Sequence, residues 1–334
     1  MRKKIIIKLI CLFILASCDT ASENEANIDN GGLFEDLQAL KAIYEANNLY
    51  VSDPRWDTLD PSVFEFLLEL GATASGPGAD ITEFRIVILS LSFKELTTIP
   101  SAIGVLTEVE LLDLSDNEIT NISEEIGNLT KLKTVYLDSN QLSSLPESIS
   151  NWTMIEEFSI RDNQLISLPS NIGDWSKVVR LVFADNQLSE IPESIGNLTL
   201  LEYLYINNNK LIALPQSIVG LTSLQWLTLE SNDLTSIPES IGLLENLTHL
   251  FAPFNELESL PVGISNLPNL RILGLQVNFF SSVPAEYGSL SSLSLLNLSG
   301  NRVLLCLPQE VWDLRSFGTT IRTDFIQGDT NCND

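Results

Sequence analysis

Apolar residues recur along most of this chain at a fixed interval of 23 residues. In each of ten units, a leading apolar residue is followed by apolar and polar positions in alternation, which is the period of a short strand with one buried face. A unit of this size cannot bury its apolar face alone, so neighbouring units must stack. Units 1 to 10 begin at Ile86, Val109, Leu132, Ile155, Val178, Leu201, Leu224, Leu247, Leu270 and Leu293.

One polar position is as regular as the apolar ones. Nine of the ten units carry asparagine at their ninth position, and Lys94 stands there in unit 1. An asparagine side chain can hydrogen-bond backbone groups that a turn leaves unpaired, so we expect a structural role. The asparagines are Asn117, Asn140, Asn163, Asn186, Asn209, Asn232, Asn255, Asn278 and Asn301.

The second half of the unit has the pattern LPxxIGxL. Proline fixes φ and has no N–H, so this half is not a strand. We expect short helical or irregular turns here, on the side of the molecule opposite to the strands. Unit 2 departs from the pattern, with Ser123 in place of proline.

The complete pattern, LxxLxLxxNxLxxLPxxIxxLxx, resembles the leucine-rich-repeat family over residues 86–315. The resemblance implies an α/β solenoid of about ten repeats, curved, with a parallel β-sheet on its concave face. Leucine-rich repeats are mainly recognition scaffolds, so the resemblance also implies binding of another macromolecule. This implication is an analogy, because a fold does not fix a function.

The segment before the repeats, residues 33–85, is predicted to be a helical cap for the exposed end of the solenoid. Leu33, Leu37, Leu40 and Tyr44 stand at helical spacing. A second helix is expected after Asp60-Pro61, up to Gly71, because proline suits the first helical position and glycine the end. Residues 71–80 are expected to be a loop that leads into the first strand.

Residues 316–334 are predicted to form a C-terminal cap. Cys306 and Cys332 are expected to form a disulfide there, because the N-terminus indicates export into an oxidising compartment. Two free thiols or a metal pair are the alternatives. Two thiolates do not complete a zinc site and no histidine lies nearby in the sequence, so the metal pair is the weaker one.

Residues 1–17 have the layout of a secretory signal, with basic residues first and then an apolar run. The run is too short to span a membrane, which takes about 20 residues. Its end, LASC, resembles the lipobox of bacterial lipoproteins and implies lipidation of Cys18; the alternative is an ordinary signal peptide with a chance cysteine. Residues 18–32 are predicted to be a flexible acidic tether. These features predict a lipid-anchored protein of the bacterial cell envelope, at the outer membrane or cell surface in preference to the inner membrane.

The formal net charge of −26 narrows the choice of partners. Nucleic acids and anionic membrane faces would repel such a chain, so we expect no nucleic-acid partner and membrane contact only through the anchor. His249 is the single histidine, and the sequence has no GxSxG, HExxH or P-loop motif. We therefore predict that the chain is not an enzyme and has no cofactor and no metal site. The oligomeric state is not predicted.

The third, fifth, seventh and eighth residues of each unit are expected to face outward from the sheet. Early units carry small and charged groups there, such as Asp113 and Asp138, whereas the middle units carry rings. Adjacent strands lie about 4.8 Å apart, so these rings are predicted to form one patch, and Tyr, Trp and Arg are enriched at binding hot spots. The candidate ligand-binding residues are Arg180, Tyr203, Tyr205, Trp226, His249, Phe251 and Phe254.

These aromatic residues need not form a binding site. Outward positions of a repeat drift freely, so the rings can be incidental. Ala252 replaces the leucine of other units, so Phe251 or Phe254 can instead turn inward to fill the space. The leading hypothesis is a non-enzymatic adhesin or receptor that binds a protein or glycan on the concave face. The alternative is a periplasmic structural or assembly partner of another envelope protein.

Overall fold

The computed structural model describes residues 32–49, 54–57, 63–76 and 84–325. The predicted signal segment, Cys18, most of the tether and Cys332 lie outside these ranges. Among the described residues, no helix is both long and apolar enough to cross a membrane.

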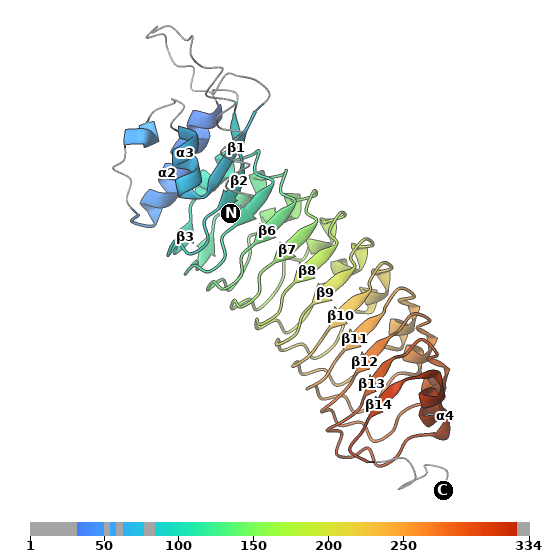
Figure 1. The fold of residues 1–334 in the computed structure, drawn as a ribbon. Helices are drawn as coiled ribbons and strands as arrows, with labels where there is room; N and C mark the ends of the chain where they lie inside the picture. The colour runs from blue at the N-terminus through green and yellow to red at the C-terminus, as the bar shows by residue number, and fades with distance from the viewer. Residues whose placement is uncertain (1–31, 50–53, 58–62, 77–83, 326–334) are drawn as a thin grey trace.

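A single long sheet runs along the molecule, with short helical turns on its other side (Figure 1). Ten of its strands come from the ten units, and each pairs in parallel with the next. The predicted leucine-rich-repeat solenoid is therefore confirmed. The ten strands are β2 (Arg85–Ser90), β4 (Leu111–Asp113), β6 (Thr134–Tyr136), β7 (Glu157–Ser159), β8 (Arg180–Val182), β9 (Tyr203–Tyr205), β10 (Trp226–Thr228), β11 (His249–Phe251), β12 (Ile272–Gly274) and β13 (Leu295–Asn297).

The register of the sheet follows the repeat with no slip. In the middle units Leu204, Leu227 and Leu250 are direct partners and are fully buried. Side chains alternate between the two faces of a strand, so the residues on either side of each leucine face away from the core. A shift by one residue would turn every leucine outward, and the buried face therefore fixes the register.

Short 3₁₀ turns follow the proline of each unit on the convex side. The proline before η7 has φ −64° and ψ 145°, and Ser123, which replaces proline in unit 2, has nearly the same conformation. The turns are η3 (Ser101–Val105), η4 (Glu124–Asn128), η5 (Glu147–Asn151), η6 (Ile172–Asp174), η7 (Glu193–Asn197), η8 (Gln216–Gly220), η9 (Glu239–Leu243), η10 (Val262–Asn266) and η11 (Ala285–Ser289). In units 1 and 2 the residues before the turn pair as β3 (Thr98–Ile99) and β5 (Asn121–Ile122).

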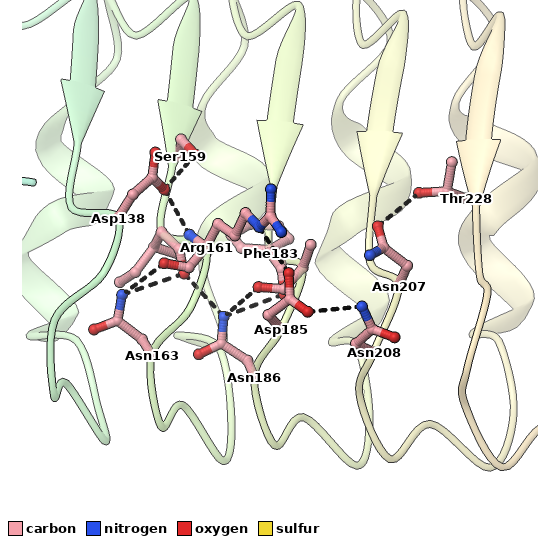
Figure 2. A network of polar contacts seen from close by, with 12 residues as sticks. Asp138, Ser159, Arg161, Asn163, Phe183, Asp185, Asn186, Asn207, Asn208 and Thr228 are labelled. Atoms are coloured by element: carbon pink, nitrogen blue, oxygen red, sulfur yellow. Dashed lines mark hydrogen bonds and ion pairs between the residues drawn. The ribbon is translucent and has the colours of Figure 1, made fainter. Parts of the chain in front are cut away.

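The repeated asparagines form a buried ladder along the interior. Asn186 is typical. Its Nδ2 donates to the carbonyl of Ile160 in the preceding unit and to two carbonyls of its own turn (Figure 2). Its Oδ1 accepts from Leu165 N–H. Each asparagine thus joins two adjacent units through backbone groups that would otherwise be buried without partners.

The solenoid interior also contains aromatic residues whose role the repeat pattern does not indicate. Trp152 and Trp175 replace the leucine before the next unit and stack with ring centroids 6.0 Å apart. Their indole N–H groups donate to Ile126 O and Ile149 O, one unit back. A buried indole needs such a partner, and the neighbouring turn supplies it.

The N-terminal cap joins the first strand through a buried ion pair. Asp36 lies in α2 (Gly32–Ala46) and is fully buried. Both of its carboxylate oxygens share the single Arg85 Nε–H, and Oδ1 also accepts from Arg85 Nη2 at 2.7 Å. Asp36 also accepts from Ile86 N–H at 2.7 Å. Burial raises the pKa of the Asp36 carboxyl, and Arg85 opposes that rise. The pair therefore ties α2 to the first strand of the repeats.

Asn47 ties the cap to unit 1 through backbone hydrogen bonds. It follows α2, accepts from Thr97 N–H and Thr98 N–H, and donates to Thr98 O. Asn47 therefore bonds the residues that follow the first turn, whereas the turn itself is bonded by Asn117 of unit 2.

The prediction of a loop over residues 71–80 is wrong for its first part. After η1 (Pro54–Asp57) and α3 (Val63–Leu70), strand β1 (Ala72–Ser75) pairs antiparallel with β2. A β-carbon at Gly71, whose φ is 87°, would lie 1.9 Å from Ser90 O, so this turn requires glycine. The strand covers the first edge of the sheet, which would otherwise expose unpaired backbone groups.

At the other end, α4 (Gln309–Trp312) and η12 (Asp313–Phe317) lead into β14 (Thr320–Arg322), which pairs in parallel with β13. The segment expected only as a cap thus adds one more parallel strand to the sheet. Cys306 is half-buried in the loop before α4. Its proposed partner Cys332 lies outside the described residues, so the disulfide stays a prediction.

Candidate ligand-binding face

Three neighbouring strands carry the predicted rings in two outward columns. Tyr203, Trp226 and His249 are direct partners across β9, β10 and β11, and so are Tyr205, Thr228 and Phe251. All of the rings are half-buried on the concave face, flanking the buried leucines. The third and fifth positions therefore face outward, as the alternation predicts.

The rings of Trp226, His249 and Phe251 form one cluster, which we call the aromatic row. Trp226 and His249 stack with centroids 4.0 Å apart and planes 18° apart, and Phe251 lies 5.5 Å from Trp226. Rings stacked at this distance cover each other's faces, so the row leaves less ring face for a ligand. Burial, with a smaller effect of Arg271, lowers the pKa of His249, which favours a neutral imidazole at pH 7.

The ring of Phe251 packs against Gly274 of the neighbouring strand, where there is no side chain. A β-carbon at Gly274 would lie 3.0 Å from the Phe251 ring, so a side chain there would crowd it. Phe251 thus remains on the concave face and does not fill the space below Ala252. Gly274 is not among the predicted residues, and neither are Ile272 and Leu295, which continue the His249 column across β12 and β13. The 23-residue interval could have located all three.

Arg180 lies on the side of the row toward unit 4. Its guanidinium carbon is 4.8 Å from the centroid of the Tyr205 ring, and its Nε is 3.2 Å from Glu157 Oε1. Arg180 and Tyr205 therefore form a cation–π pair, anchored by a carboxylate from the preceding strand. This pair marks the transition from charged early units to aromatic middle units.

The early and middle units also share a polar network where their strands end (Figure 2). Asp138 accepts from Ser159 and from Arg161 N–H, and Asp185 pairs with Arg161 Nε and accepts from Asn208. Both carboxylates are thus hydrogen-bonded within the protein, and Asp185 is also ion-paired. The charged half of the face therefore offers less unpaired charge than its composition indicates.

Phe254 is separate from the aromatic row. It lies in the turn after β11, with φ 53°, and is 49% exposed, so it does not turn inward. It lines a pocket of about 440 Å³ between successive turns, together with Val277 and Phe279. The prediction that groups Phe254 with the other rings is wrong, because the left-handed turn at the eighth position carries it away from the strands.

Family comparisons agree with this architecture. A leucine-rich-repeat region matches residues 184–270, and a model of two leucine-rich repeats matches residues 107–151. The chain is a leucine-rich-repeat protein. Such repeats generally mediate protein binding and are generally non-enzymatic scaffolds. No curated protein sequence matches the chain.

Solved structures of similar fold come from bacteria and plants. A leucine-rich-repeat protein of Leptospira interrogans is 27% identical, with 72% of each chain covered and a TM-score of 0.54. The ectodomain of the Arabidopsis thaliana receptor kinase GASSHO1/SCHENGEN3, solved in complex with CASPARIAN STRIP INTEGRITY FACTOR 2, is 26% identical with a TM-score of 0.72. That alignment covers 84% of this chain and only 34% of the receptor. A Listeria monocytogenes internalin, 17% identical over 90% of this chain and 93% of its own, with a TM-score of 0.53, shares the fold.

Proposed function

We propose that this chain is a lipid-anchored binding protein of the bacterial cell envelope, an adhesin or receptor that recognises a protein ligand on its concave face. The observation that carries the proposal is the aromatic row together with the Arg180–Tyr205 pair. Tyr, Trp and Arg on a rigid surface, flanked by apolar neighbours, have the composition of a binding hot spot. The sheet beneath holds them in place through fully buried leucines.

The stacking geometry favours a protein ligand over a glycan. Sugars bind aromatic side chains by lying on an open ring face, and Trp226 and His249 cover one face of each other. Side chains of a protein can pack against ring edges and between the columns. Leucine-rich repeats generally mediate protein binding, which supports the same choice.

The lipid anchor rests on the sequence of the N-terminus. Lipidation of Cys18 would hold the repeats at a membrane, and residues 18–32 would hold them clear of it. Protease treatment of intact cells tests the location: loss of the protein supports a surface receptor, whereas protection supports the alternative periplasmic role.

Ligand capture tests the binding face. The wild-type chain would be compared with a Tyr205→Ala, Trp226→Ala, Phe251→Ala triple variant in pull-downs from envelope and host extracts and on a glycan array. The control is Tyr136→Ala, which removes a ring from the same outward column outside the row. We expect a protein ligand that the triple variant loses and the control retains. Equal capture by all three proteins would refute the concave site, and binding only on the glycan array would refute a protein ligand.

A further inference from the structure

The turns of units 8 and 9 break the polar pattern that units 2 to 7 keep, as Phe93 also does in unit 1. At the eighth position, units 2 to 7 carry only Asp, Ser or Asn, whereas units 8 and 9 carry Phe254 and Val277. At the tenth position nine units carry a polar residue, and unit 9 carries Phe279. These three side chains are 49%, 41% and 62% exposed, so they do not fill the core.

The backbone at the eighth position makes this substitution unfavourable for folding. Phe254 has φ 53° and Val277 has φ 56°, in the left-handed region that Asn, Asp and Gly tolerate best. A β-branched residue is especially strained there. Polar residues would suit both the solvent and the backbone, so the apolar ones stand there against local preference. Such strained positions are concentrated at functional sites.

The three side chains line the pocket of about 440 Å³ that opens between successive turns; we call it the C-terminal turn pocket. Its charged lining residues are Asp233, Glu256 and Arg302, and none of them forms an ion pair within the described part of the chain. The local balance is therefore two acids against one base, on a chain with a net charge of −26. An apolar pocket with an acidic surround is complementary to an apolar group beside a cation.

We propose that the C-terminal turn pocket binds a protein segment that inserts an apolar side chain flanked by basic residues. Phe254, Val277 and Phe279 form the apolar lining, and Asp233 and Glu256 attract the flanking cations. The proposal adds a second surface to the proposed binding function, and each of the two surfaces can fail its test separately.

Synthetic peptides supply defined probes. Extended peptides of one length would carry a central Phe or Ala flanked by Lys or by Glu, and their binding to the full-length chain would be measured by fluorescence anisotropy. We expect the Phe–Lys peptide to bind about tenfold more tightly than the Ala–Lys and Phe–Glu peptides, as burial of one aromatic side chain implies. Equal binding of Phe–Lys and Ala–Lys would reduce the effect to net charge and overturn the proposal.

The decisive variant restores the residues that other units carry: Phe254→Asn, Val277→Asn, Phe279→Gln. It should lose the preference for Phe–Lys while its thermal midpoint stays equal or rises. A lower midpoint would mean that the three side chains serve packing, and retained preference would place the site elsewhere; either result overturns the proposal. Phe93→Asn is the matched control, because Phe93 has φ 57° at the same position of unit 1.

Two further experiments distinguish this pocket from the concave face and from a lipid-binding site. The Tyr205→Ala, Trp226→Ala, Phe251→Ala variant should keep the peptide preference, since its changes lie on the strands. Neutral phosphatidylcholine vesicles would be added as a competitor. If they displace the Phe–Lys peptide from the wild-type chain, the pocket is a lipid contact and the proposal of a protein partner fails.

Discussion

Along this solenoid, the inward asparagine ladder and the outward strand columns differ in how much they vary. The ladder has the same residue in nine units, each amide bonds the same kinds of backbone group, and each is buried. The outward third column changes at every step through the middle of the molecule, from Glu157 to Arg180, Tyr203, Trp226 and His249.

The difference shows where stability and recognition reside. Ladder groups are out of contact with water, so the protein itself must satisfy each donor and acceptor. Outward groups can hydrogen-bond to solvent instead, so the residue type at these positions can vary and can suit a ligand. We therefore expect inward changes to lower the free energy of unfolding and outward changes to leave it nearly unaltered.

The largest loss is expected from Asn209→Ala. Its Nδ2 donates to Phe183 O and Ile206 O, and its Oδ1 accepts from Leu188 N–H. Each buried group left without a partner costs about 1–3 kcal/mol, so we expect a total loss of about 4 kcal/mol in urea unfolding. Lys210→Ala, at the adjacent exposed position, is the control; an equal loss there would contradict the contrast between inward and outward positions.

Next in size is Asp36→Asn at the junction of the cap and the sheet. The change leaves Arg85 partly buried without its counter-ion, and loss of one partner of a buried pair costs several kcal/mol. We expect a loss of about 3 kcal/mol in the same assay, by that reasoning. Asp57→Asn, which breaks the exposed pair with Lys41, should barely move the midpoint. Similar shifts for both variants would show that burial does not determine the cost.

Tyr287→Phe removes one buried hydroxyl, and its effect on the free energy of unfolding depends on pH. The hydroxyl donates to Pro261 O at 2.9 Å, so its loss should cost about 1 kcal/mol at pH 7. Burial raises the pKa of Tyr287 well above its ordinary value of 10, so above pH 10 the unfolded chain releases a proton that the folded chain keeps. The stabilising contribution is thus complete below pH 10 and declines above it. The free energies of unfolding of the two proteins should therefore become equal between pH 10 and 11. A difference that stays constant with pH would contradict this prediction.

How far the sequence predicts the structure depends on the same contrast. The interval of 23 residues locates the leucines, the asparagines and the register, because each of these is dictated by burial. The strand β1 is not predicted, because Ala72–Ser75 has no strand pattern. It forms by pairing with the free edge of β2. The role of Asn47 is not predicted either, because it lies outside the repeat and meets Thr97 only in the folded cap.

The candidate site is predictable in composition but less so in geometry. Alternation places Trp226, His249 and Phe251 on one face, and the register makes them neighbours. Whether their rings stack or lie flat depends on side-chain torsions that no periodicity encodes. The separation of Phe254 from the row depends on a left-handed residue, which the repeat signals only through the Asp, Ser and Asn at other eighth positions.

The smallest predicted effect reverses the sign of the others. Val277→Asn places a residue that tolerates φ 56° where a β-branched residue is strained, and Val277 is 41% exposed, so little packing is lost. We expect a gain of about 1 kcal/mol in the free energy of unfolding, from relief of backbone strain. Ser231→Asn, at the same position of unit 7 with φ 54°, should gain less, since serine has no branched carbon to clash. If Val277→Asn instead destabilises the chain, Val277 contributes to packing. Outward positions would then stabilise the fold as the asparagine ladder does.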